Sequence, residues 1–148
     1  LIPEQYHKRI VVHGHFYLKD EYRLKGVHLS ERNSNLPENF KGHVSRSCHT
    51  LEEIKMHKRN CDYILFSPDF EHSTDKTFHA NYTPEAGIID KKVIALGGIT
   101  LDNARQAKEF GFGGVAIMSD VWDKFNTCTD CDYTQLIQHF KKLKKLVD

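Results

Sequence analysis

Short, almost entirely apolar segments recur along the chain, each bounded by polar residues or by glycine. These segments show little alternation between polar and apolar positions. Continuous apolar runs of this length are typical of strands that are buried on both faces, as they are in a parallel sheet. We therefore predict strands over residues 9–12, 26–29, 43–45, 62–66, 92–96 and 114–118.

Helical patterns separate several of these strands. Thr50 and Glu53 have the spacing of a capping box, in which each side chain bonds the other residue's N–H, and this predicts a helix from 51 to about 58. Thr100 is predicted to cap a second helix. That helix should stop at Gly111, because a left-handed glycine commonly follows the last turn of a helix.

A third helix is predicted over 133–147, where apolar residues recur at helical intervals. Its lysines, between 141 and 145, complement the helix dipole, which explains them better than an anionic partner does. Strands that alternate with helices predict a parallel β/α architecture. No linker or low-complexity stretch interrupts the chain, so we expect one domain over 1–148.

Composition narrows the range of partners. The 148 residues carry a formal net charge of +1, which gives no support to nucleic-acid binding. No apolar run approaches the ~20 residues that cross a bilayer, and no export leader is recognisable. We expect a cytoplasmic protein with small-molecule partners, without nucleic acid or membrane, and the sequence leaves open whether it forms a homo-oligomer.

Two cysteines, Cys128 and Cys131, have the spacing of metal ligands. A structural zinc site needs four ligands, and His139 is the only further candidate nearby. Two ordinary thiols in a loop therefore explain the pair better than a metal site does.

The strongest functional signal is the pair Gly97-Gly98, which falls between a predicted strand and a predicted helix. Glycine lets a ligand come close to the backbone, and the start of a helix offers unpaired N–H groups. The segment from Gly113-Gly114 to Asp120 repeats this pattern one unit later. Because the turns after the last two strands of a β/α barrel bind phosphate, the sequence predicts a phosphate site here.

Polar side chains also follow other predicted strands. A loop over 67–76 contains hydroxyls and Lys76, which are suited to holding a diphosphate, although an ordinary solvated loop explains them equally well. His13 and His15 follow the first predicted strand. A histidine there is either a general acid or base or a hydrogen-bonded rim residue, and the sequence does not decide between these roles.

The order of these motifs resembles the thiamine phosphate synthase family, with its thiazole tautomerase relatives. The Gly26–Leu29 segment (GVHL) and the turns at Gly97-Gly98 and Met118-Ser119 are the most specific parts. The resemblance implies a closed (β/α)8 TIM barrel, in which the predicted strands are the third to the eighth. We therefore expect that the first two β/α units, and residues after the apparent helix start at Thr83-Pro84, are absent from this sequence.

The resemblance also implies a reaction and a set of site residues. A hydroxymethylpyrimidine diphosphate would lose pyrophosphate, and the nitrogen of a thiazole phosphate would capture the pyrimidine. The loop that would hold the diphosphate contains Ser73, Thr74 and Lys76. The site for the thiazole phosphate would consist of Gly97, Gly98, Met118 and Ser119. The candidate catalytic residues are Lys76, His13 and His15.

Magnesium is the cofactor that the resemblance implies. At the positions of the family's metal-binding carboxylates, however, this chain has His13-Gly14 and the segment 30–33. Glu31 and Asn33 are left as the candidate ligands, although Mg²⁺ prefers carboxylate oxygens. The alternatives to a synthase are therefore a tautomerase-like relative and a non-catalytic protein that binds thiazole phosphate.

Overall fold

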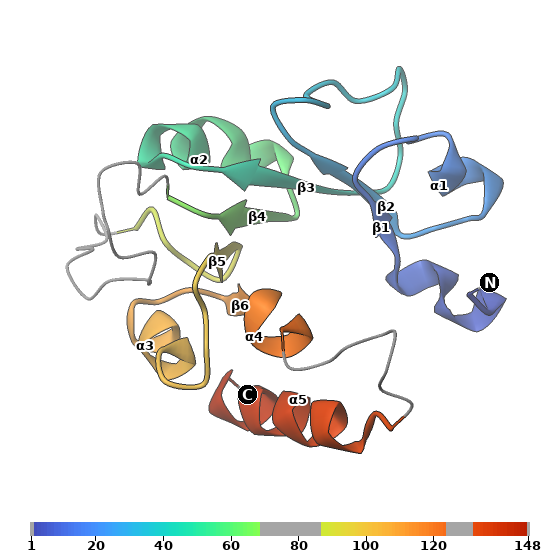
Figure 1. Cartoon of the computed structure of the whole chain (residues 1–148). Coiled ribbons are helices and arrows are strands. Elements are labelled where there is room, and N and C mark those ends of the chain that lie inside the picture. The colour runs from blue at the N-terminus through green and yellow to red at the C-terminus, as the bar shows by residue number, and fades with distance from the viewer. Residues whose placement is uncertain (1, 69–86, 124–131, 148) are drawn as a thin grey trace. The chain divides into compact units, whose positions relative to one another are not determined.

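The computed structural model describes residues 2–68, 87–123 and 132–147. The predicted strands are all present, with shifted ends at several of them (Figure 1). Their bounds are β1 (Val11–Val12), β2 (Gly26–Leu29), β3 (His43–Cys48), β4 (Tyr63–Phe66), β5 (Val93–Leu96) and β6 (Gly114–Ala116). The hydrogen-bonded order is β1-β2-β3-β4-β5-β6, so strands that are consecutive in the chain are also neighbours in the sheet. The α/β class predicted from the sequence is confirmed.

The expected closed (β/α)8 TIM barrel is wrong for this chain. The described strands form an open sheet in which β1 and β6 are the two end strands. A barrel closes only when its last strand bonds to its first, and the common form needs eight strands with matching tilt and stagger. Local patterns predict each strand correctly but contain no information about closure.

The helical elements connect these strands. They are η1 (Glu4–Arg9), α1 (Leu18–Glu21), α2 (Leu51–His57), η2 (Lys58–Asn60), α3 (Ala104–Glu109), α4 (Ser119–Trp122) and α5 (Thr134–Val147). The capping box of α2 is confirmed, because the Glu53 N–H donates to Thr50 Oγ1 over 3.2 Å. Gly111 has the expected left-handed conformation, with φ of 85°. The predicted helix after Thr100 is shorter than expected, because turns occupy 101–103 and α3 begins at Ala104.

The chain divides into two compact units, Leu1–Leu65 and Phe66–Asp148. In the first unit, the whole of β2 is buried, and β1, β2 and β3 pair in parallel. Side chains of β3 and α2, including Val44 and Ile54, complete its apolar core. Because all of β2 is buried, the GVHL segment has only one polar residue, His28.

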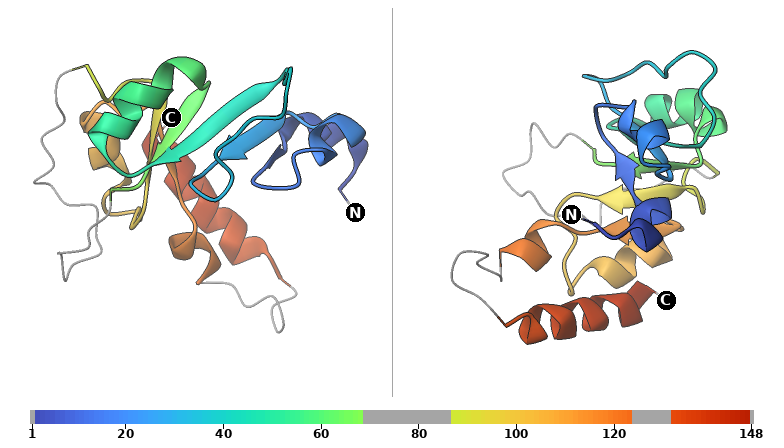
Figure 2. Two further views of the ribbon diagram at one scale, coloured as in Figure 1. Left: turned by 90° about the horizontal axis from the view of Figure 1, so that it is seen from above. Right: turned by 90° about the vertical axis from the view of Figure 1, so that its right-hand side faces the viewer.

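In the second unit, β5 and β6 pair in parallel, and α3 packs against β6. Val93, Ala95, Ala104 and Ala107 are fully buried in this core. The helix α5 lies beside α3 and α4 and buries Leu143 (Figure 2). No helix among the described residues is both long and apolar enough to cross a membrane.

Candidate functional site

The first unit contains a buried histidine that is bonded at both ring nitrogens. His28, on β2, is only 2% exposed. Its Nδ1 lies 2.9 Å from Ser45 Oγ, and its Nε2 lies 2.8 Å from Ser47 Oγ. Since His28 is in register with Ser45, and alternate residues of a strand share one face, the two serines of β3 point to the same side as His28.

The His28 ring also supports His13. The two rings stack with their centroids 4.3 Å apart and an interplanar angle of 24°. Burial, together with the nearby His13 and Arg46, lowers the pKa of His28 from 6.5 to about 4. His28 is therefore neutral near pH 7, so that one ring nitrogen donates to a serine and the other accepts. The result is a rigid, uncharged support for the exposed ring of His13.

The structure brings some of the predicted residues of this unit together and leaves others apart. Asn33 donates from Nδ2 to the carbonyl oxygen of His13 over 3.2 Å. Backbone hydrogen bonds between Ser30 and Asn33 hold the turn after β2 in place. His15 has a left-handed backbone, with φ of 49°, and its ring meets the edge of Tyr17. His13 and Asn33 are thus neighbours, whereas the His15 ring contacts Tyr17.

The candidate magnesium ligands do not suit that ion. The Asn33 side chain is engaged through its nitrogen, and its oxygen is a neutral ligand. Glu31 is the only carboxylate in the turn over 30–33 and is exposed. Among the described residues, no three His, Cys, Asp or Glu side chains gather as a metal site. The described residues therefore do not supply the set of carboxylate oxygens that Mg²⁺ prefers.

His28, Ser45 and Ser47 were not among the residues predicted for a site. Their signal was a single histidine inside an otherwise apolar buried strand, with two serines alternating along the next strand. A histidine in such a run needs partners for both nitrogens. The pairing of β2 with β3, which supplies those partners, is a tertiary contact that no local pattern specifies.

The second unit contains the predicted glycine turn. Gly97 and Gly98 directly follow β5 and have φ values of 102° and 61°, which favour glycine. A Cβ on Gly97 would lie 3.1 Å from Ser67 Oγ, so the turn also has little space for a side chain. Successive N–H groups in such a turn form a concavity that binds anions. The turn is therefore suited to a phosphate group.

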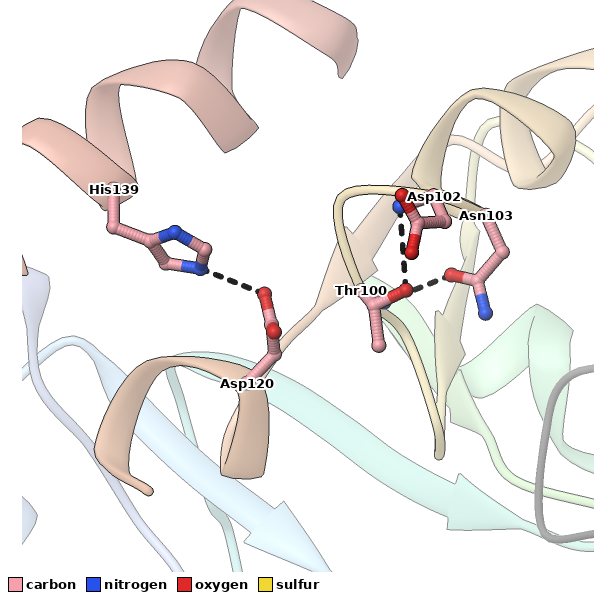
Figure 3. A network of polar contacts seen from close by, with 5 residues as sticks. All are labelled: Thr100, Asp102, Asn103, Asp120 and His139. Atoms are coloured by element: carbon pink, nitrogen blue, oxygen red, sulfur yellow. Dashed lines mark hydrogen bonds and ion pairs between the residues drawn. The ribbon is translucent and has the colours of Figure 1, made fainter. Parts of the chain in front are cut away.

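Asn103 holds this turn in its conformation. Its Nδ2 donates to the carbonyl oxygen of Gly98 over 2.8 Å, and its Oδ1 accepts from the Thr100 N–H, also over 2.8 Å. The Asp102 N–H in turn donates to Thr100 Oγ1 over 3.3 Å (Figure 3). Thr100 thus caps a turn rather than α3 itself. Asn103, which sequence analysis did not single out, links the glycine turn to the start of α3.

Met118 and Ser119 lie near the end of the neighbouring strand. Because Leu96 is in parallel register with Ala116, the segments that follow β5 and β6 emerge at the same edge of the sheet. Met118 is 70% exposed, and Ser119 begins α4. The next residue, Asp120, pairs with His139 of α5 over 2.7 Å (Figure 3). The Asp120–His139 pair connects the segment that carries Ser119 to α5.

The expectation that Gly113-Gly114 repeats the glycine turn is wrong. These glycines lie at the start of β6, at the opposite end of the strand from Ser119. A Cβ on Gly113 would lie 2.0 Å from the carbonyl oxygen of Lys91, which leaves room only for hydrogen. This glycine allows two backbones to pack closely. The strand predicted over 114–118 already placed this glycine pair at its start, where it cannot form a turn after the strand.

Several predicted residues lie outside the described residues. These are Ser73, Thr74 and Lys76 of the diphosphate loop, the apparent helix start at Thr83-Pro84, and the cysteines Cys128 and Cys131. The candidate zinc partner of the cysteines, His139, is described, and it pairs with Asp120.

The parallel strand order and the glycine turn after β5 place the chain in the class of parallel β/α proteins that have a glycine turn at the carboxyl end of a strand. Residues 2–121 match the sequence model of a family described as thiamine monophosphate synthase. The chain belongs to this family.

Individual relatives agree with this assignment. The crystal structure of a thiamine phosphate pyrophosphorylase from Bacteroides thetaiotaomicron is 49% identical, with a TM-score of 0.85 over 99% of this chain and 74% of that one. A curated thiamine-phosphate synthase from Flavobacterium johnsoniae is 26% identical over 79% of this chain and 63% of its own length. One from Latilactobacillus sakei is 27% identical over 78% of this chain and 57% of its own. The chain thus spans about three-fifths of these curated relatives.

Proposed function

We propose that the protein acts as a thiamine phosphate synthase, joining a hydroxymethylpyrimidine diphosphate to a thiazole phosphate with release of pyrophosphate. The observation that carries this proposal is the family match over residues 2–121, which includes both the Gly97-Gly98 turn and Ser119. The solved pyrophosphorylase that is 49% identical supports the same activity.

In this proposal, the thiazole phosphate binds at the second unit's turn. The N–H groups of Gly97 and Gly98 face the phosphate oxygens, and Ser119 adds its hydroxyl from the adjoining strand end. Backbone donors held in place by Asn103 need no rearrangement when the ligand arrives. Met118, which is largely exposed, covers the apolar part of the ligand.

The reaction exchanges one bond for another. The C–O bond between the pyrimidine's methylene carbon and its diphosphate breaks, and the electron pair leaves with the pyrophosphate. The lone pair of the thiazole nitrogen then forms the new C–N bond to that carbon. Negative charge grows on the leaving group, and we assign Lys76, Ser73 and Thr74 to stabilise it. No proton transfer is needed in this exchange, so the proposal assigns no acid or base role to His13, whose ring stacks on His28.

The proposal routes no step through Mg²⁺, because the described residues near β1 and β2 do not fit that ion. It places the protein in the cytoplasm, where the buried thiols of Cys48 and Cys61 would stay reduced. Its substrates are small phosphorylated molecules.

A turnover assay tests the proposal. The full-length protein is incubated with both substrates, with and without Mg²⁺, and thiamine phosphate and pyrophosphate are measured. The proposal expects the two products in equal amounts. Binding of the thiazole phosphate without any product would contradict it and would indicate a binding protein.

A further inference from the structure

A cavity lies in the first unit, on the other face of its sheet from His28. Its volume is ≈ 500 Å³, which is within the range of small-molecule sites. Leu29 and Val44 form its apolar floor, and Arg46 lies beside them. Since Arg46 alternates with Ser45 and Ser47 along β3, it points away from the two serines that bond His28. The cavity is therefore distinct from the site proposed for the reaction.

Arg46 has no partner for its charge in the part of the chain that the structure describes. It makes no side-chain hydrogen bond or ion pair there, although it is half-buried. The Glu53 carboxylate, which like Arg46 influences the pKa of His57, is engaged by other groups, because its Oε2 accepts the His49 N–H over 2.6 Å and the Thr50 N–H over 3.4 Å. A guanidinium that is partly removed from water and unpaired is costly, and an anion would offset that cost.

The other polar groups of the cavity are uncharged. They include Ser34, Asn35, His57 and Asn60. Burial and the neighbouring Arg46 lower the pKa of His57, while the Glu53 carboxylate acts in the opposite direction, so the neutral ring is favoured at pH 7. Together with the two-pronged donor of Arg46, these side chains offer more N–H groups than the two oxygens of a carboxylate use. The three terminal oxygens of a phosphate monoester match them better.

We propose that this cavity binds a small organic phosphate, with Arg46 gripping the phosphate oxygens and the apolar floor of Leu29 and Val44 contacting the organic part. This site lies outside the proposed reaction and adds a second phosphate ligand to the protein. Phenyl phosphate is a suitable probe, because it carries one phosphate monoester and one apolar ring.

The test is a titration of the full chain with phenyl phosphate, followed by the NMR signals of the Asn35 and Asn60 side-chain amides. The backbone amides of 97–100 report separately on the glycine turn. Saturable shifts of both asparagines are expected, and Arg46→Gln should weaken this binding by about tenfold or more. Arg46→Lys keeps the charge but loses the planar fork, so it should weaken binding to an intermediate extent.

Arg59→Gln is the matched control, because Arg59 is an exposed neighbour of Asn60 that does not line the cavity. It removes the same charge and should leave the affinity unchanged. Equal weakening by Arg59→Gln would overturn the proposal, since it would point to general surface charge. The absence of saturable shifts at about 10 mM phenyl phosphate would also overturn the proposal. Equally tight binding of benzoate would do the same, because benzoate carries a carboxylate in place of the phosphate.

Discussion

The side-chain amide of Asn103 bonds both sides of the turn that follows β5: it donates to the carbonyl oxygen of Gly98 and accepts from the N–H of Thr100. One side chain therefore fixes two peptide groups on either side of Ile99. Glycine has many accessible backbone conformations, so contacts from outside the turn decide which one it keeps. In this protein, the shape of the proposed phosphate site depends on a residue that does not itself belong to the turn.

Replacing Asn103 should therefore loosen the turn. Asn103→Ala removes both hydrogen bonds, and we expect it to lower the free energy of unfolding by about 1–3 kcal/mol. The affinity for thiazole phosphate should fall with it. Asn103→Asp is the control, because it keeps the acceptor for Thr100 but loses the donor to Gly98. Denaturant unfolding and calorimetric titration measure the two effects, and an unchanged affinity in Asn103→Ala would show that the turn keeps its shape unaided.

Gly98→Val should abolish thiazole phosphate binding while the fold survives. A left-handed conformation costs a residue with a Cβ about 1–2 kcal/mol, and the valine side chain would also obstruct the approach of a phosphate. Gly111→Val is a matched control, because Gly111 is also left-handed, with φ of 85°, and nothing lies within 4 Å of its Cβ position. Both variants should lose similar stability, but only Gly98→Val should lose binding in a calorimetric titration. Loss of affinity in both variants would mean that general destabilisation is responsible.

The buried His28 should make stability depend on pH. Its pKa is about 4 in the folded protein, against 6.5 as the ordinary value. Between these values the unfolded chain binds the additional proton, so the contribution of His28 is fully present above pH 6.5 and is lost as the pH falls toward 4. At the low end of this window, we expect His28 to have lowered the free energy of unfolding by roughly 2–3 kcal/mol.

Denaturant unfolding across that window, for the protein and for His28→Gln, measures the effect. His43 and His57, whose pKa values are also lowered by burial, contribute to both proteins and cancel in the difference. The variant should be less stable at pH 7 but less sensitive to acid. The same pH dependence in both proteins would contradict the pKa shift of His28.

The structure shows how far local sequence patterns specify this protein. The β2 strand and the Thr50 cap of α2 were predicted accurately, because buried apolar runs and capping spacings act locally. Three other features were not predicted: the role of Gly113, the partners of His28 and the open sheet. Each of them depends on which backbone segment or strand lies alongside in the fold. The glycine turn was found, while the asparagine that holds it was not, since Asn103 acts through a carbonyl five residues earlier.

The turn near His13 should bind Mg²⁺ only weakly, because Glu31 is its one carboxylate. A Cβ on Gly14 would lie 3.9 Å from Asn33 Nδ2, which is ordinary contact, so the structure has room for acids at both positions. Gly14→Asp combined with Asn33→Asp should therefore strengthen Mg²⁺ binding by about tenfold or more and raise Mg²⁺-dependent turnover. Calorimetry with Mg²⁺ and the turnover assay check this. Strong Mg²⁺ binding by the unchanged, unliganded protein would show that other residues hold the ion.

A crystal structure of the full-length protein with thiazole phosphate tests the central claim most directly, which is that the turn after β5 and Ser119 hold the substrate's phosphate. We predict the phosphate at hydrogen-bonding distance from the N–H groups of Gly97 and Gly98 and from the Ser119 hydroxyl. A thiazole phosphate bound instead at Lys141–Lys145, with this turn empty, would contradict the account.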